Sequence, residues 1–203
     1  MDDTLINHNS WYQLNIALGI TPEEDKEMYD AYGKGEITYN EWTTKLNSLY
    51  QERGLATREN IEQMLEKITF KEGAEELVAY LRNRGYQLAI ISGSFDATVK
   101  RAAESLNIPN YQANTKLVFN EDDYLKNIVS DGEEVYAKLK HLEEMCEKLG
   151  VEIEECACIG DGANDIEMFK KTNKGITFNT APENLKKVSW RTVNNLSEIK
   201  NLL

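Results

Sequence analysis

Short apolar segments alternate with helical patterns throughout the chain after about residue 70. Residues 87–92, 156–159 and 176–178 are short apolar runs. The helical patterns that separate and flank them cover about 73–84, 95–106, 133–149 and 163–171. Strands that alternate with helices form a parallel sheet with helices on both faces. The sequence therefore predicts an α/β fold with a doubly wound, Rossmann-like sheet, to which residues 112–129 add a β-hairpin.

Residues 8–69 show helix signals only. Thr21 with Glu24, and Thr38 with Glu41, have the spacing of capping boxes, in which each side chain binds a backbone N–H of the other residue. We expect four helices, over about 10–18, 22–33, 39–53 and 57–68. Together they predict a helical bundle, which differs in character from residues 1–7 and from the α/β part at 70–203.

The segment from Ile159 to Asp165 follows a predicted strand and opens a helix. It reads Ile-Gly-Asp-Gly-Ala-Asn-Asp and carries two carboxylates, Asp161 and Asp165, four residues apart. In open α/β sheets, ligands bind beyond the carboxyl ends of the strands. Mg²⁺ favours a few carboxylates together with water and phosphate oxygens. The alternative is an acidic surface turn, with Asp165 compensating a helix dipole.

Three further segments are weak signals when each is taken alone. Ser92 closes a predicted strand, where its hydroxyl and the following N–H groups can hold a phosphate oxygen or merely cap a helix. Lys138 lies within a predicted helix, where most lysines are solvated. Asp2 and Asp3 are adjacent acids near the first residue, a pattern without meaning of its own.

Taken together, the four segments resemble the haloacid dehalogenase superfamily, and most closely its phosphoserine-phosphatase-like branch. Residues 160–165 with Met168 resemble the family's fourth motif, and residues 91–95 resemble the second. Lys138 has the spacing of the third motif, and residues 2–5 resemble the end of the first. The resemblance implies a core of 1–7 and 70–203, with 8–69 as a cap inserted after the first motif.

The resemblance also implies a mechanism through an aspartyl-phosphate. A nucleophilic aspartate attacks phosphorus, and a second aspartate two residues later acts as acid and base. Asp2 maps onto this second aspartate, and its backbone carbonyl onto a ligand of Mg²⁺. Ser92 and Lys138 would balance the charge of the transferring phosphoryl group.

The remaining site residues follow from the same motifs. Asp161 would bind Mg²⁺ directly, and Asp165 directly or through water. Asn164 and Gly93 would contact the substrate or its phosphate, and Thr4 would orient the loop of the first motif. The implied function is Mg²⁺-dependent phosphomonoester hydrolysis.

One departure from the family concerns the nucleophile. The first motif reads Asp-x-Asp-x-Thr, and Met1 stands at its second position. The nucleophile, and the central strand expected between the strands that end at Ser92 and Ile159, would therefore precede Met1. We favour a natural protein that is longer by one strand. The alternatives are a non-catalytic pseudophosphatase that binds phosphate or a metabolite, and a gap filled by another segment, for example from a second copy. A phosphotransferase is a further possible function.

A second departure concerns the substrate. Asn9 stands where phosphoserine phosphatases have a glutamate for the substrate ammonium group, and Leu46 stands near their carboxylate-binding arginine. Both differences argue against phosphoserine as the substrate. The cap is rich in aromatic residues, which either pack the bundle or form a pocket for an apolar alcohol or a quaternary ammonium group. These residues are Trp11, Tyr12, Tyr29, Tyr32, Tyr39, Trp42 and Tyr50.

Composition narrows the class of partner. The net charge of −12 argues against nucleic acid and anionic membranes, because phosphates repel an acidic surface. The longest apolar runs have four residues, too few to cross a bilayer. Three cysteines match no metal-binding spacing and fit a reducing cytoplasm. We therefore expect a cytoplasmic monomer or homodimer that acts on a small phosphorylated metabolite, and we expect His141 on a helix surface.

Overall fold

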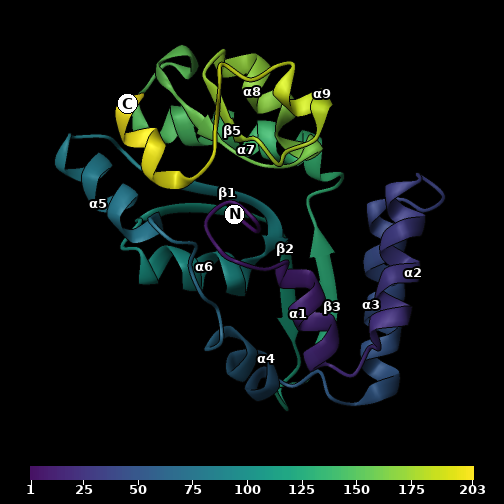
Figure 1. Ribbon diagram of the computed structural model, residues 1–203. Helices are drawn as coiled ribbons and strands as arrows, with labels where there is room; N and C mark the ends of the chain where they lie inside the picture. The colour runs from purple at the N-terminus through teal and green to yellow at the C-terminus, as the bar shows by residue number, and fades with distance from the viewer.

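The computed structural model describes residues 1–203 and confirms the α/β class (Figure 1). The helices are α1 (Ser10–Ala17), α2 (Pro22–Gly33), α3 (Tyr39–Arg53), α4 (Arg58–Leu65), α5 (Ala74–Asn83), α6 (Asp96–Ser105), α7 (Glu134–Leu149), α8 (Ile166–Thr172) and α9 (Glu183–Lys186). The strands are β1 (Ala89–Phe95), β2 (Asn110–Phe119), β3 (Leu125–Ser130), β4 (Cys158–Ile159), β5 (Gly175–Phe178) and β6 (Arg191–Val193). Short 3-10 helices cover Ile153–Glu155, Ala163–Asp165 and Leu196–Asn201.

The strands form two sheets of three strands each, in the orders β1-β2-β3 and β4-β5-β6. β1 pairs in parallel with β2, and the expected hairpin is confirmed as the antiparallel pair β2–β3. β4, β5 and β6 are parallel. β1 and β4 do not pair with each other, so the sheet that we expected as one is divided in two.

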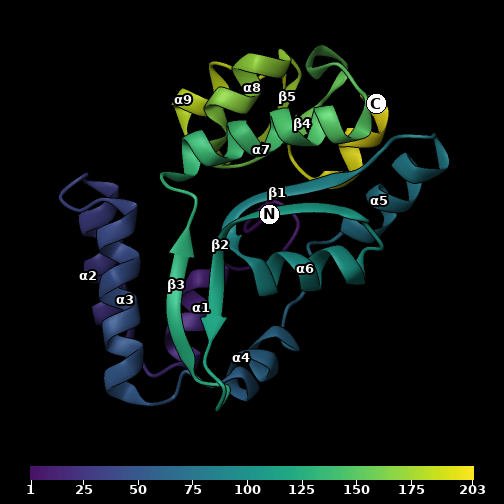
Figure 2. The same cartoon turned by 180° about the vertical axis from the view of Figure 1, so that it is seen from behind.

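Residues 1–7 lie against the divided sheet. Met1 and Ile6 pack in a hydrophobic cluster with Ile90 of β1, and Leu5 contacts both that cluster and the one around Ile176 of β5. The N-terminus accordingly lies in the middle of the molecule, beside β1, whereas the C-terminus lies near α5 (Figures 1 and 2). This placement brings the first residues to the carboxyl ends of β1 and β4.

Helix starts in residues 8–69 follow the predicted capping signals. Thr21 and Thr38 each accept a hydrogen bond from the third helical residue in a complete capping box. Thr57 caps α4, and Gly54 ends α3 with a φ of 67°. Such a left-handed backbone is easiest for glycine. The four predicted helices are therefore confirmed.

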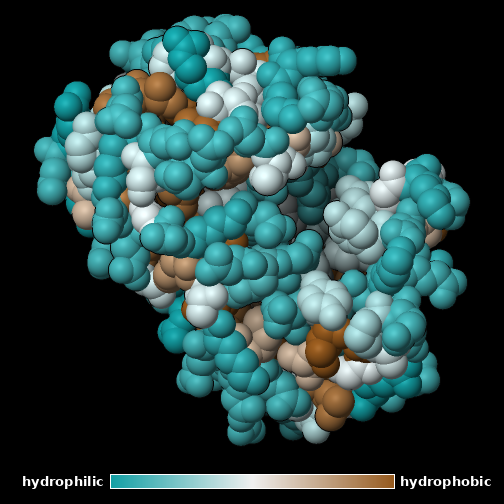
Figure 3. Space-filling model, in the orientation of Figure 1, coloured by the Kyte–Doolittle hydropathy of each residue, from teal (hydrophilic) through white to brown (hydrophobic).

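The largest hydrophobic cluster joins the four cap helices to the β2–β3 hairpin. It has 17 buried residues, among them Trp11, Trp42, Leu117 and Ile128. In space-filling view the surface is mostly hydrophilic and is hollowed between the α/β lobe and the arm formed by α2 and α3 (Figure 3). The division between core and cap at residues 69 and 70 stays a prediction. The β2–β3 hairpin, which follows residue 70 in the chain, packs in the same cluster as the cap helices.

Three local expectations need correction. β1 continues to Phe95 rather than ending at Ser92, and 163–165 form a 3-10 turn before α8. His141 is only 2% exposed instead of lying on a helix surface, because it shares the buried face of α7 with Lys138 and Leu142. Its Nε2 lies 3.0 Å from Asp131 Oδ2. No helix has both the length and the apolar character needed to cross a membrane.

Candidate active site

The loop after β4 is organised around the carboxylate of Asp165. Its Oδ2 accepts hydrogen bonds from the backbone N–H groups of Asp161 and Gly162, both at 3.1 Å. A Cβ on Gly160 would collide with this carboxylate, so the close approach requires glycine. Asp165 thus holds the loop in the shape that presents Asp161.

Lys138 provides a positive charge beside the loop after β4. Its side chain projects from α7 and is buried, with Nζ donating to Asp165 Oδ1 at 2.8 Å and to Asn164 Oδ1 at 3.0 Å. Burial alone would lower the pKa of Lys138, but the charges of Asp165 and Glu134 outweigh it and raise that pKa. Burial likewise opposes ionisation of Asp165, yet Lys138 lowers its pKa overall. Both groups are therefore charged at neutral pH.

Glu134 is a site residue that the sequence analysis missed. Asn164 Nδ2 donates to its Oε2 at 2.7 Å, and its carboxylate lies against Gly93. Burial is the main cause that raises the pKa of Glu134. Glu134 lies one helical turn before Lys138, and this spacing is a signal that the two share a helix face.

The N-terminal half of the site is built from Asp2 and Thr4. Asp2 Oδ2 accepts from the backbone N of Ser10 at 2.7 Å and from Ser10 Oγ at 2.6 Å. Ser10 Oγ is also hydrogen-bonded to Ser94 Oγ, and Thr4 Oγ1 donates to Asp161 Oδ1. Asp2 Oδ1 is buried and has no partner. These bonds tie residues 2–4 to the ends of β1 and β4.

Ser92 and Gly93 lie in the second half of β1, where cap and core meet. The N–H of Ser94 donates to Ser92 Oγ at 3.2 Å. Tyr39 of α3 donates its hydroxyl to the Gly93 carbonyl at 3.2 Å and is also hydrogen-bonded to Thr115 at 2.9 Å. The predicted second motif thus contacts the cap through a buried tyrosine.

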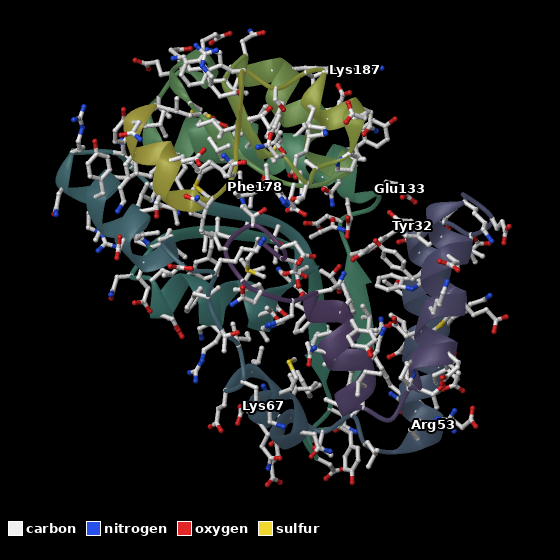
Figure 4. All side chains as sticks on the ribbon, viewed as in Figure 1. Tyr32, Arg53, Lys67, Glu133, Phe178 and Lys187 are labelled. Atoms are coloured by element: carbon white, nitrogen blue, oxygen red, sulfur yellow. The ribbon has the colours of Figure 1, made fainter.

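Glu133 makes a second link between cap and core. Its Oε1 accepts from the backbone N of Tyr39 at 3.0 Å, and its Oε2 from the Tyr32 hydroxyl at 3.5 Å. Glu133 and Tyr32 point toward each other across the hollow (Figure 4). The start of α7 therefore contacts the cap through Glu133 and the core through Glu134.

The donors at this site fit Mg²⁺ in part. No group of three or more His, Cys, Asp or Glu side chains is arranged to hold a metal ion. However, Mg²⁺ is often held by one or two carboxylates with water and phosphate. Asp161 has its pKa raised by burial, and Asp2 has an unpartnered oxygen; both are properties of carboxylates without a compensating cation. Asp165 is already bonded at both oxygens, which favours its contact with a metal through water.

The structure brings the predicted residues to one place. Lys138, Asn164 and Asp165 are in direct contact, and Thr4 contacts Asp161. Asp2 is bonded to Ser10, and Ser10 contacts Ser94 of β1. The roles assigned to these residues remain predictions.

Comparison with known proteins agrees with this fold and with the family resemblance. Residues 1–173 match the family model for haloacid dehalogenase-like hydrolases. A phosphoserine phosphatase of Methanocaldococcus jannaschii is 31% identical over 181 residues, which cover 89% of this chain and 83% of that protein. One of Archaeoglobus fulgidus is 32% identical over 93% of this chain, which spans only 53% of that relative.

Solved structures give the same result. A phosphoserine phosphatase described as a phospho-aspartyl intermediate analogue superposes with a TM-score of 0.83 at 30% identity, covering 100% of this chain and 95% of the other. A substrate-bound phosphoserine phosphatase has a TM-score of 0.82 at 29% identity over the same share of both chains. The chain therefore belongs to the haloacid dehalogenase-like hydrolase family, in its phosphoserine-phosphatase-like branch.

Proposed function

We propose that the chain provides the site of a Mg²⁺-dependent phosphatase that acts on a small phosphorylated metabolite. The observation that carries this proposal is the buried contact of Lys138 with Asn164 and Asp165. A buried lysine held in place by a carboxylate is ready to balance a phosphoryl group without reorganisation. The phosphatase relatives of the branch support the same chemistry.

Each residue has a defined task in this proposal. Ser92 and Lys138 hold phosphoryl oxygens, and Asn164 positions the phosphate or the leaving group. Asp2 transfers the proton to the leaving oxygen, and Ser10 orients its carboxylate through two hydrogen bonds. Asp161 and the Asp2 carbonyl hold Mg²⁺, which when bound supplies charge stabilisation at the phosphoryl group.

The position of the nucleophile determines whether residues 1–203 can form an aspartyl-phosphate. In the register of the first motif, Met1 occupies the second position, so none of these residues occupies the nucleophilic one. We propose that the polypeptide 1–203 binds Mg²⁺ and phosphate but does not form an aspartyl-phosphate. The second candidate function is a pseudophosphatase that binds a phosphorylated ligand without hydrolysing it. A phosphotransferase would need the same nucleophile.

The substrate differs from phosphoserine in this proposal, although the relatives are phosphoserine phosphatases. The side chain of Asn9 caps α1 by accepting from Tyr12 N at 3.0 Å, and Leu46 is fully buried. Neither position offers a charge for an amino acid. Trp11 and Trp42 pack edge to face at 4.9 Å within the cap cluster, which supports packing rather than a ligand pocket. A cytoplasmic location and a monomer or homodimer remain predictions.

The test is hydrolysis of an aryl phosphate with Mg²⁺. Residues 1–203 would be compared with the same chain lengthened before Met1 by an apolar strand that ends in Asp. We expect turnover in the lengthened chain only, abolished by chelation of Mg²⁺ and by Lys138→Met. If neither chain turns over but phosphate still binds, the pseudophosphatase is the correct function. Turnover by residues 1–203 alone would show that the nucleophile assignment is wrong.

A further inference from the structure

The carboxylate of Glu134 contacts the groups that the proposed function assigns to phosphate. It accepts a hydrogen bond from Asn164 Nδ2 at 2.7 Å, and Asn164 in turn accepts one from Lys138 at 3.0 Å. Its three terminal atoms lie 2.5–2.9 Å from the position that a Cβ on Gly93 would take. The Glu134 carboxyl group therefore rests on the backbone of β1 just after Ser92.

A dianionic phosphate cannot share this place with Glu134. Two like charges in a partly desolvated site repel strongly, and each disfavours the ionised form of the other. The carboxylate and a phosphoryl group would also compete for the same Asn164 donor and for the space above Gly93. Binding of phosphate at Ser92, Gly93 and Lys138 thus requires that the Glu134 side chain leaves.

We infer that Glu134 is a built-in anion that occupies the phosphate subsite of this chain until substrate displaces it. The inference rests on the proposed function, because that function assigns the subsite. It makes Glu134 a competitor of the substrate, in contrast to Lys138 on the same helix face, which attracts phosphate. Glu134 consequently weakens the affinity of the site for any phosphorylated ligand.

The position of Glu134 allows this displacement. It is the first residue of α7, and its side chain has three rotatable bonds by which the carboxylate can swing without backbone movement. No residue forms an ion pair with Glu134 within 4 Å, and its second oxygen, Oε1, accepts no hydrogen bond. Glu133 meanwhile stays bonded to Tyr39 of the cap, so the start of α7 remains anchored when Glu134 moves.

The test is titration of residues 1–203 with inorganic phosphate in the presence of Mg²⁺, followed by calorimetry. Glu134→Gln removes the charge and keeps the shape, and Glu134→Ala removes both. We expect each variant to bind phosphate about ten-fold more tightly than the unchanged chain, because a like charge is removed from the subsite. Glu147→Gln, an exposed position on the same helix with the same change of net charge, should alter the affinity less than about two-fold.

The outcomes separate the inference from the proposed function. If the unchanged chain binds phosphate and both Glu134 variants bind equally or more weakly, Glu134 is not a competitor, and the inference is overturned while the phosphate site stands. If Glu147→Gln tightens binding as much as Glu134→Gln, the effect is one of net charge, and the inference is again overturned. If no variant binds phosphate, the proposed function fails, and the inference fails with it.

Discussion

The two halves of the site differ in how completely their polar atoms are satisfied. In the half formed by α7 and the loop after β4, Lys138 is bonded to Asn164 and Asp165, and both oxygens of Asp165 have partners. In the half formed by the first residues, Asp2 Oδ1 is buried without a partner. Buried polar groups are nearly always paired, so the unpaired oxygen of Asp2 is available to a water molecule or a ligand. The contacts of Lys138 and Asp165 therefore stabilise the first half of the site, whereas Asp2 in the second half keeps one oxygen free to bind.

Replacement of Lys138 should have the largest effect. Lys138→Met leaves Asp165 buried without its counter-ion, so we expect the free energy of unfolding to fall by about 3–5 kcal/mol. Urea denaturation followed by circular dichroism measures this change. Lys140→Met, on the same helix but 66% exposed, is the matched control and should cost less than about 1 kcal/mol. Equal losses in the two variants would refute the scaffold role of Lys138.

The first prediction becomes more specific when the free energies of unfolding of the unchanged chain and of Lys138→Met are compared at several pH values. The folded pKa of Asp165 is lowered, so its stabilisation is present above the unfolded value of about 3.9 and is lost as the pH falls through the folded value. Without Lys138, burial raises the pKa of Asp165 instead, so Lys138→Met gains stability on acidification. The difference in the free energy of unfolding between the unchanged chain and Lys138→Met should therefore become smaller below about pH 4. Urea denaturation at several pH values measures this difference, and a constant difference from pH 7 to pH 3 would contradict the assignment.

Asp2 should contribute less to stability than Lys138, because only one of its oxygens is bonded. Asp2→Asn keeps the shape but removes the charge that Ser10 binds, and we expect a loss of about 1–2 kcal/mol. Asp3→Asn is the matched control, since Asp3 is exposed and its left-handed φ of 50° is tolerated by Asn. Thermal unfolding of both variants gives the comparison. A larger loss for Asp3→Asn would show that residues 2–4 are placed differently.

Replacement of Asp161 should increase the free energy of unfolding, whereas the replacements of Lys138 and Asp2 should decrease it. Burial raises its folded pKa above the unfolded value, so its charge at neutral pH opposes folding. In metal-free buffer, Asp161→Asn should therefore raise the free energy of unfolding, by at most about 1 kcal/mol because the carboxylate is partly exposed. Thermal unfolding with a chelator present measures this gain. A loss of stability in the chelator would mean that Thr4 and the neighbouring charges already satisfy Asp161.

Local signals predicted the turn after β4 and the helix starts, and the family resemblance added Lys138, but neither predicted the contacts of Glu134 that cross the fold. The glycines and acids of 160–165 determine a turn by themselves, and capping residues such as Thr38 determine helix starts. The place of Glu134 depends on Gly93, which lies far away in the sequence, and the burial of His141 depends on how α7 packs against the rest of the fold. The division of the sheet agrees with the family resemblance, which places a strand that precedes Met1 between β1 and β4.

The measurement that tests the central claim most directly is thermal unfolding of residues 1–203 with Mg²⁺ and inorganic phosphate, singly and together. A ligand at one hundred times its Kd stabilises the folded state by about 2.7 kcal/mol. We predict a rise in Tm that is largest with both ligands present and is lost in Asp161→Asn. No rise at saturating concentrations, or a rise that Asp161→Asn leaves unchanged, would contradict a Mg²⁺-assisted phosphate site.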